Sequence, residues 1–500
     1  MPKIVKISVN NFTGGVAEDP RENSNTKSII SKHFDIFSQS NRLLPYRNLV
    51  ADTNDGSTAT GMKQYFVQDM VYASGSTKLY GLGQTAGGLT KIVYKSDVTT
   101  LGWTLPSSSE GNGSVKNGCF VEYKDYMWGF QGTNQVFKWG LLSGTPSITN
   151  SVSTTGATIT SVAQGIIAKD DNLYLPYNNI IGRVTSTGTY NDAVLTLPTN
   201  YKITSIDNYG NYLAIACAPV STYNGVSKVF LWNLTSTDVQ ESYDIGAGEV
   251  RVLGVIEGMI VTISDVYLNN TVGAGRGSMV IKVLQGNTFQ PLKEIFTQSL
   301  VGKTIPLSKA VRNNRLFFSA KLMTNSAGTE YNEGIWSFGR KNVNSNFALS
   351  LDVIDENVNT SGIQSFGVAG NFFFISHSSD GSIDSTSSTA TYTFTSIHET
   401  LIYNFGDVAD TKKLKLFTIK TAPITAGTIT IKYKIDSDTS WTTMGSLSTV
   451  GETSHDFYKN ESTLTEFPSF SEIKFRIEST GGIEPTGFNA EADILIGSTG

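Results

Sequence analysis

The sequence predicts an all-β protein, built as a seven-bladed β-propeller followed by a C-terminal antiparallel β-sandwich. Three observations lead to this fold class. A hairpin pattern recurs along the middle of the chain, the residues favour strands over helices, and the pattern changes near residue 395. With 500 residues the chain exceeds one ordinary core, so two or more folding units or one large closed β architecture are expected.

The recurring unit is a short turn followed by four or five apolar residues. Examples are "KDYMWGFQ" at 124–131 and "AGNFFFISH" at 369–377. Equivalent apolar positions follow one another at steps of 39 to 57 residues, close to the period of propeller blades. These positions are Leu79, Tyr126, Leu173, Tyr212, Met259, Leu316 and Phe372. Seven blades are predicted on this count, with six or eight left open.

Each repeat has the content of a propeller blade. A short apolar strand precedes the turn, as in "CFVEY" at 119–123, and a strand with aromatic or branched residues follows, as in "KVFLWN" at 228–233. Asn, Asp and Gly at the turns tolerate the positive φ that tight hairpins require. Radial stacking of such sheets buries their apolar faces and leaves few free edges. Short helical turns are expected only at 28–32 and 236–243.

The remaining segments complete the predicted domains. Strict alternation from about residue 395 predicts a separate sandwich of about a hundred residues. The N-terminal segment contains an "FTGG" turn and a strand–turn–strand pattern at 32–49, and it is expected to add strands to the last blade. The prediction is therefore an N-terminal arm at 1–60 that closes the ring, a propeller at 61–394 and a sandwich at 395–500.

Composition and charge argue against several classes of protein. The net charge is −5 and only 16% of the residues are charged, so the basic stripe of a sequence-specific nucleic-acid groove is not expected. The most hydrophobic window, 252–263, is broken by two glycines and Glu257, so no membrane span is predicted and a soluble protein is expected. Cys119 and Cys217 lie in apolar segments and are interpreted as buried thiols.

No constellation of residues predicts a reaction centre. His33, His377, His398 and His455 lack metal-chelating spacing, and no G-x-S-x-G motif occurs. The oxygen-rich segments 52–58 and 378–385 break the register of a calcium loop and are interpreted as solvated turns. "GLGQTAGG" at 81–88 is followed by a strand pattern instead of a helix, which makes it a hairpin turn. The sequence therefore predicts no catalytic, cofactor-binding or metal-binding residues, and no enzyme.

Two further features are interpreted as structural. "SDVTTLGW" at 96–103 is similar to an Asp-box turn, which stabilises a fold, and "FRIE" at 475–478 lies outside the propeller. Tryptophans could stack on sugars, but five of the six lie in or beside blade strands, where core packing is expected. The six are Trp103, Trp128, Trp139, Trp232, Trp336 and Trp441.

Both ends of the chain carry patterns of a known family. "NNFTGGVAEDPREN" at 10–23 has an F-x-G-G turn and a D-P-R segment. "KHFDIFSQSNRLLPYR" at 32–47 matches an N-F-D-[IV]…L-x-x-R pattern, with His33 in the usual place of asparagine. "IKYKIDSDTSWTTMG" at 431–445 and "FRI" at 475–477 complete the pattern near the C-terminus. The chain resembles tail structural proteins of tailed bacteriophages over about a third of its length.

The resemblance implies a virion component that is made in the host bacterial cytoplasm and assembled in the tail, as a nozzle, tail-tip or fibre-attachment protein. Its expected partners are copies of itself in a ring and neighbouring tail proteins, because virion rings repeat contacts between like subunits. A host surface glycan or receptor is a further partner left open. The alternative function is a glycan-binding or glycan-cleaving propeller that acts through loops at 268–278 and 322–334.

Overall fold

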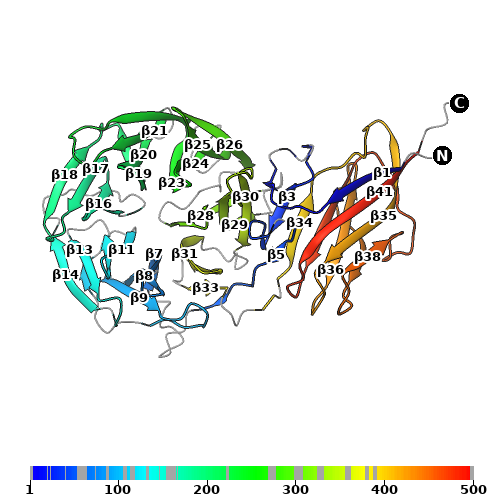
Figure 1. The fold of residues 1–500 in the computed structure, drawn as a ribbon, viewed down its shortest axis with the longest axis horizontal. Coiled ribbons are helices and arrows are strands. Elements are labelled where there is room, and N and C mark those ends of the chain that lie inside the picture. The colour runs from blue at the N-terminus through cyan, green and yellow to red at the C-terminus, as the bar shows by residue number, and fades with distance from the viewer. Residues whose placement is uncertain are drawn as a thin grey trace. The chain divides into compact units, whose positions relative to one another are not determined.

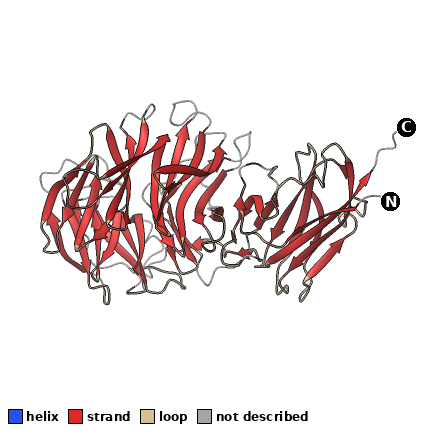
Figure 2. Ribbon diagram, turned by 45° about the horizontal axis from the view of Figure 1, so that its top comes forward, coloured by secondary structure: helices blue, strands red, loops and turns tan. Residues whose placement is uncertain are grey.

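The computed structural model contains strands and no helix among the residues it describes (Figure 2). The described residues are 4–17, 19, 21–22, 24–39, 41–52, 65–73, 75–85, 89–104, 110–112, 119–130, 135–145, 147–153, 165, 167–220, 225–267, 277–297, 308–323, 331–354, 362–377, 382–386, 391–392 and 394–495. Within these ranges there is also no helix long and apolar enough to cross a membrane. Residues 28–32, where a helical turn was expected, lie in a strand, and Glu241–Ala247 forms another.

The chain divides into two compact units, which are described separately. Unit 1 contains residues 1–48, 336–354 and 390–500, and unit 2 contains residues 49–335 and 355–389. Unit 2 holds the propeller and unit 1 holds the sandwich. Each unit is assembled from segments that are separated in sequence.

Five four-stranded antiparallel sheets follow one another along unit 2, and Figure 1 shows them around a common centre. Their strands are β7 (Tyr65–Ala73), β8 (Lys78–Thr85), β9 (Leu89–Lys95) and β10 (Glu110–Asn112); β11 (Cys119–Tyr123), β12 (Tyr126–Phe130), β13 (Gln135–Gly140) and β14 (Ser147–Ser153); β15 (Ile167–Lys169), β16 (Asn172–Tyr177), β17 (Ile180–Val184) and β18 (Tyr190–Thr196); β19 (Tyr201–Tyr209), β20 (Tyr212–Pro219), β21 (Val226–Trp232) and β22 (Glu241–Ala247); and β23 (Glu249–Ile256), β24 (Met259–Tyr267), β25 (Gly277–Gln285) and β26 (Thr288–Thr297).

A sixth four-stranded sheet takes its outermost strand from the N-terminal segment. It consists of β31 (Ile363–Ala369), β32 (Phe372–His377), β33 (Ile383–Ser385) and β6 (Val50–Ala51). The strands β27 (Lys309–Arg312), β28 (Arg315–Met323), β29 (Tyr331–Gly339) and β30 (Ala348–Ile354) follow the same order, but the division of the chain falls inside β29. The propeller fold is thus established, and the count of seven blades stays a prediction.

The predicted repeat corresponds to one place in each set of strands. The seven equivalent positions lie at or next to the first residue of β8, β12, β16, β20, β24, β28 and β32, which is the second strand of each set. Several hairpins before these strands have two residues with positive φ, such as Lys124 and Asp125 or Asn313 and Asn314. Turns of this kind match the twist of the flanking strands. The local turn chemistry therefore sets the repeat.

Neighbouring sheets of the propeller pack through their apolar faces. Tyr80 and Leu82 of β8 share one buried cluster with Met127 and Trp139 of the next sheet. A cluster that contains Val67 of β7 and Phe374 of β32 joins the first sheet to the sixth. These contacts bury what a single hairpin leaves exposed, and the last of them closes the ring.

Two facing sheets form the sandwich of unit 1. One has the order β1 (Ile4–Val9), β41 (Pro485–Leu495), β35 (Thr411–Thr421) and β38 (Ser454–Phe457), with β39 (Ser469–Phe470) beside β35. The other has the order β30, β3 (Lys27–Lys32), β34 (Ser396–Thr400), β40 (Ile473–Ser479), β36 (Ile429–Ile435) and β37 (Thr442–Leu447). Phe417 and Phe488 of the first sheet pack on Phe475 of the second, with ring centroids 4.6 and 6.0 Å from it. One continuous core lies between the sheets.

The strands of the N-terminal segment divide between the two units. β1 pairs along its length with β41, and β3 pairs with β34, so both belong to the sandwich. β2 (Gly15–Val16) runs parallel to β3, while β4 (Phe34–Asp35) and β5 (Leu44–Pro45) form the strand–turn–strand expected at 32–49. β6 is the strand that enters the propeller.

Two residues have positive φ in the described part of this segment. Gly15 has φ +69°, and a Cβ there would lie 2.6 Å from the carbonyl oxygen of Leu349. His33 has φ +58°, a region where asparagine, aspartate and histidine are enriched among residues other than glycine. Histidine can therefore occupy a position where related patterns have asparagine.

Candidate functional site

The strands nearest the centre of the propeller carry a repeated irregularity (Figure 1). In β7, β19, β23 and β31 the pairing with the following strand skips one residue. A β-bulge of this kind bends the strand and re-aims the next side chain. In three of the four strands that side chain is polar, and it is Asp69, Ser205 or Ser365.

Polar side chains join three of the repeats to the next one along the chain. In each case a side chain on an inner strand, or directly before it, accepts a hydrogen bond from a backbone N–H one repeat further along. The three pairs are Asp69 with Phe120 (2.9 Å), Ser205 with Leu253 (3.2 Å) and Ser308 with Phe366 (3.2 Å). We call these three contacts the inner-strand clasps. They replace backbone pairing between sheets that do not share a ladder, and so they fix the sheets relative to each other.

Lys309 of β27 extends the clasps across three inner strands. Its Nζ donates to the carbonyl oxygens of Ile206 in β19 and Leu253 in β23, both at 2.6 Å, and lies 3.3 Å from Oδ2 of Asp207. Burial lowers the pKa of Lys309, and the carboxylate of Asp207 partly offsets this. Burial likewise raises the pKa of Asp69 well above its usual range. These ionisable groups hold backbone atoms, and the geometry gives them a positioning role.

The closure of the ring rests on a buried ion pair and two serines. Asp52, directly after β6, lies 3.0 Å from Nζ of Lys95 in β9, and both side chains are at most 1% exposed. The hydroxyls of Ser365 and Ser376 both donate to the carbonyl oxygen of Val67, at 2.8 and 2.6 Å. The last sheet and the N-terminal strand are thus tied to the first sheet by polar contacts that water does not reach.

The histidines do not assemble a metal centre in the part of the chain that the structure describes, where no group of three or more His, Cys, Asp or Glu side chains could hold an ion. His377 Nε2 lies 3.1 Å from Oδ2 of Asp384 in the same sheet, and both are buried. His455 lies 3.2 and 3.1 Å from the carboxylates of Glu452 and Glu461, which raise its pKa against the opposing effect of burial. Both histidines therefore have carboxylate partners of their own.

The cysteines are free thiols, as the sequence predicted. Cys119 and Cys217 are completely buried in β11 and β20. Burial raises the pKa of both thiols well above the usual value, which disfavours the reactive thiolate. They pack as small apolar side chains.

The oxygen-rich segments are described only in part. Residues 53–58 lie outside the described residues, and Asp52 is engaged by Lys95. Residues 378–381 also lie outside them, and Asp384 is paired with His377. The aspartates that the structure describes in these segments are therefore already bonded within the sheets.

Of the segments singled out from the sequence, the display loops are largely outside the described residues, whereas the strands around the glycine-rich segment and the turn at 96–103 are described. The two predicted display loops are 268–278 and 322–334. Their residues 268–276 and 324–330 lie outside the described residues. The glycine-rich segment at 81–88 continues β8 to Thr85, and β9 begins at Leu89, so strands flank it as predicted. In the turn at 96–103 the carboxylate of Asp97 accepts hydrogen bonds from the backbone and hydroxyl of Thr99, which is a structural use.

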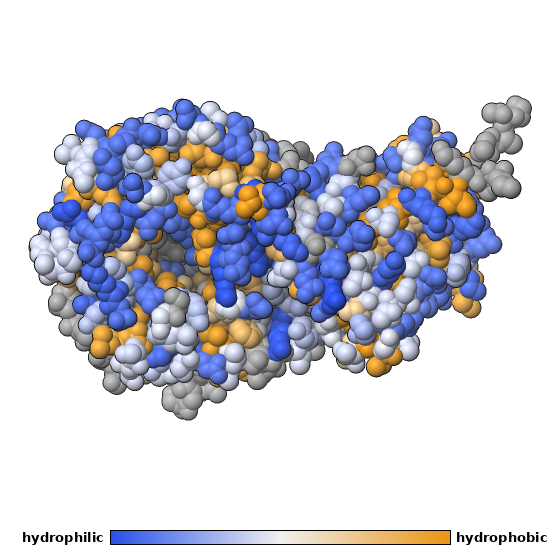
Figure 3. Space-filling view, viewed as in Figure 1, coloured by the Kyte–Doolittle hydropathy of each residue, from blue (hydrophilic) through white to orange (hydrophobic). Residues whose placement is uncertain are grey.

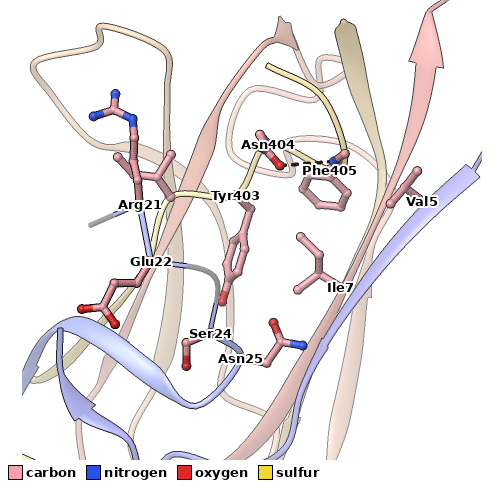
Figure 4. Close-up of a pocket in the computed structure, with 11 residues that line it drawn as sticks. Val5, Ile7, Arg21, Glu22, Ser24, Asn25, Tyr403, Asn404 and Phe405 are labelled. Atoms are coloured by element: carbon pink, nitrogen blue, oxygen red, sulfur yellow. Dashed lines mark hydrogen bonds between the residues drawn. The ribbon is translucent and has the colours of Figure 1, made fainter. Parts of the chain in front are cut away.

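A cavity of about 390 Å³ lies within unit 1, between β1 and the chain around residues 402–406. Figure 4 shows Tyr403 extending between Ser24 and Ile7, while the charged ends of Arg21 and Glu22 point away from the middle of the cavity. Burial raises the pKa of Tyr403, so the phenol stays protonated at neutral pH and cannot act as a base there.

The charged residues that line this cavity have partners elsewhere in unit 1. Arg21 donates two hydrogen bonds to the carboxylate of Glu472, at 3.0 and 3.1 Å, and Glu22 pairs with Lys27. The cavity therefore has a wall that is more polar than apolar, with one phenol, and among the described residues that line it there is no pair of opposed carboxylates of the kind that glycoside hydrolysis uses.

The tryptophans divide as expected. The five of the propeller strands and turns are between 1% and 7% exposed and belong to the core. Trp441 of the sandwich is partly exposed. On the face shown in Figure 3, hydrophobic residues lie in small groups among hydrophilic ones.

Comparisons with known proteins return distant likenesses of structure alone. No family model matches the sequence, and no curated protein matches it. Raptor of Chaetomium thermophilum is similar at 10% identity and a TM-score of 0.44, over 68% of this chain and 29% of that one. The Pan2 WD40 domain of Neurospora crassa is similar at 10% identity and a TM-score of 0.42, over 70% of this chain and 96% of that one. Hydrazine synthase of Kuenenia stuttgartiensis is similar at 10% identity and a TM-score of 0.43, over 65% and 96%. This chain thus spans less than a third of the Raptor chain, and we draw no function from these likenesses.

Proposed function

We propose that this protein is a structural component of the tail of a tailed bacteriophage, acting through protein–protein packing. The observation that carries the proposal is that the two ends of the chain fold together. The segments that resemble tail proteins, one near each terminus, belong to a single folded unit in which β1 pairs with β41. The resemblance therefore concerns one physical module, and the propeller is inserted into its sequence.

The propeller supports this role by its construction. The inner-strand clasps near the centre and the Lys95–Asp52 pair on the outer strands use polar groups to fix sheets against each other. A body held in this way suits a fixed place in an assembly. It is less suited to a site that must bind and release a substrate through movement.

The sandwich offers an edge for assembly. β1 is the outer strand of its sheet and has no further partner strand among the described residues. Ile4 at its start is 45% exposed. A free edge of six residues can pair with a strand of another chain. We infer that copies of this protein in a ring, or neighbouring tail proteins, use such contacts, in a virion assembled in the host bacterial cytoplasm.

The test is to locate the chain on the particle. An antibody raised against the whole chain is applied to purified phage particles from the source culture, followed by gold labelling and electron microscopy. Gold at the tail is expected, and it should vanish when the antibody is first adsorbed with purified protein. Label on the capsid alone, or particles without label in preparations where the antibody detects the chain by blotting of the cell fraction, contradicts the proposal.

A further inference from the structure

One face of the sandwich gathers more positive than negative charge around a single tryptophan. On the strands β36 and β40 the side chains alternate, with Ile431, Tyr433 and Phe475 in the core and charged residues on the other face. We call this outer face the Trp441 surface. It consists of Lys432, Lys434, Trp441, Lys474 and Arg476, with Glu399 and Glu478 beside them.

The arrangement of the cations is unfavourable by itself. Lys434 and Lys474 are directly opposite each other in the antiparallel pair, and like charges at opposite positions destabilise a sheet. Both ammonium groups and the guanidinium of Arg476 lie over the ring of Trp441, at 5.1, 5.3 and 4.5 Å from its centroid. The indole therefore holds three cations close together, through attraction to its π face.

The carboxylates nearby do not balance this charge. Glu399 pairs with Arg476, and Glu478 pairs with Lys432 at 2.8 Å and contacts Arg476 at 3.5 Å. Four cations thus share two carboxylates. Lys434 and Lys474 have no ion pair with a carboxylate among the described residues, and in that same part of the chain Lys474 has no hydrogen bond either.

The electrostatics of Lys474 agree with this arrangement. Burial lowers the pKa of Lys474, the carboxylate of Glu399 partly offsets it, and the charges of Lys434 and Arg476 lower it further. An anion bound beside Lys474 would remove the repulsion and supply the missing hydrogen-bond acceptor. The surface is thus complementary to a group of negative charge.

We propose that the Trp441 surface binds the anionic groups of an acidic polysaccharide. Hydroxyls border the cations, since those of Thr430 on β36, which is half-buried, and Ser446 on β37, which is exposed, lie 3.0 Å apart, and such groups suit the hydroxyls of a sugar. A nucleic acid is a poorer occupant, because its phosphate ladder calls for a longer basic stripe than four cations that share two carboxylates. This site belongs to the sandwich, and the proposal does not depend on the tail role.

The test compares polymers that differ in their anionic group. The purified full chain is titrated with polygalacturonate, which carries carboxylates, with phosphorylated dextran, which carries phosphates, and with neutral dextran, by isothermal titration calorimetry. Binding to one or both acidic polymers and none to dextran is expected. The polymer that the chain binds more tightly then shows whether the surface prefers carboxylate or phosphate groups.

Variants assign the binding to this surface. Lys474→Gln should weaken binding about tenfold, since it removes a charged hydrogen-bond donor. Its melting temperature should equal or exceed that of the unchanged chain, because the substitution removes a like charge. The matched control is Lys415→Gln on the opposite sheet, where the lysine is 52% exposed and 3.9 Å from Asp493, and it should leave the affinity unchanged.

Several results would overturn the inference. Equal binding of dextran and the acidic polymers is one, and loss of affinity in both lysine variants alike is another. Binding to a single-stranded DNA oligonucleotide as tight as to either polysaccharide would reject the saccharide as the occupant. Absence of binding to both acidic polymers at low salt would reject the site.

Discussion

Replacing Lys95 by methionine should destabilise the propeller strongly, because it leaves the carboxylate of Asp52 buried without its partner. The two side chains are 1% and 0% exposed, and Nζ lies 3.0 Å from Oδ2. At this distance two unit charges attract by about 5 kcal/mol at an effective dielectric constant of about 20. Burial costs both ions solvation, and the removal of one partner of a buried pair usually costs about 3–5 kcal/mol. We expect a loss of that size for Lys95→Met.

The double variant Asp52→Asn/Lys95→Met separates the lost attraction from the loss of packing. This variant buries no charge without a partner at the site, so most of the stability should return. Equilibrium urea unfolding followed by tryptophan fluorescence is a suitable assay, since Nζ of Lys95 lies 5.8 Å from the ring centroid of Trp103. Lys415→Met, at an exposed pair, is the control and should cost less than about 1 kcal/mol.

One result would refute this reasoning about ring closure. If Lys95→Met and the double variant lost the same small amount of stability, the pair would add nothing beyond its packing. The N-terminal strand β6 would then be held by its pairing with β33 alone.

Three further predictions concern other parts of the fold. Burial lowers the pKa of His398 to about 3 from 6.5, so its contribution to stability should be complete above pH 6.5 and fall by about 1.4 kcal/mol per pH unit below it. His398→Phe should therefore reduce the pH dependence of the unfolding free energy, measured with urea, between about pH 6.5 and 4.5. An unchanged slope would contradict this. Gly15→Ala should cost at least about 1–3 kcal/mol in thermal unfolding, as its φ is +69° and Leu349 O is close, whereas Gly188→Ala, with φ +82° and nothing within 4 Å, should cost only the backbone strain. Both cysteines should resist a thiol reagent in the native protein and react on unfolding; rapid labelling at neutral pH would contradict their burial.

The sequence allowed the propeller to be predicted because its signal is local. Turn residues with positive φ, such as Asp170 and Asp171, precede an apolar strand in each repeat, and both features are visible in a few residues of sequence. The sandwich was predictable for the same reason, since β40 alternates strictly between buried and more exposed side chains, and β35 does so on either side of a bulge at Leu414–Leu416.

The partition of the N-terminal segment could not be predicted in this way. β1 and β6 are short strands without a distinctive pattern, and their partners β41 and β33 lie hundreds of residues away. A short strand does not reveal in its own sequence which distant strand it pairs with, because a pattern of a few residues fits the edges of many sheets. The sequence therefore predicts that the segment 1–60 serves the propeller as a whole, whereas its described strands divide between the units.

Two of the three inner-strand clasps were missed because their role depends on a bulge. Asp69 and Ser205, like Ser365 at the closure of the ring, look like ordinary polar residues of half-buried strands, and the skipped residue before each one turns it towards the next sheet. A signal was present, since Ser205 and Ser365 each stand two residues after an isoleucine in the first strand of a repeat. A lone polar residue at a recurring position in an apolar strand predicts a contact between repeats.

The chain crosses between the two units four times, which constrains how the protein can be divided. Residues 395–500 alone would lack β1, β3 and β4, and with the N-terminal segment they would lose Val9, Phe12 and Phe34 of the sandwich core. Each such buried side chain contributes about 1.5–3 kcal/mol, a large share of the stability of a domain of this size. The sandwich therefore needs the N-terminal segment, and a fragment cut at the change of sequence pattern would not contain a complete core. The boundary visible in the sequence marks a change of sheet type, while the folding unit is defined by which strands share a core.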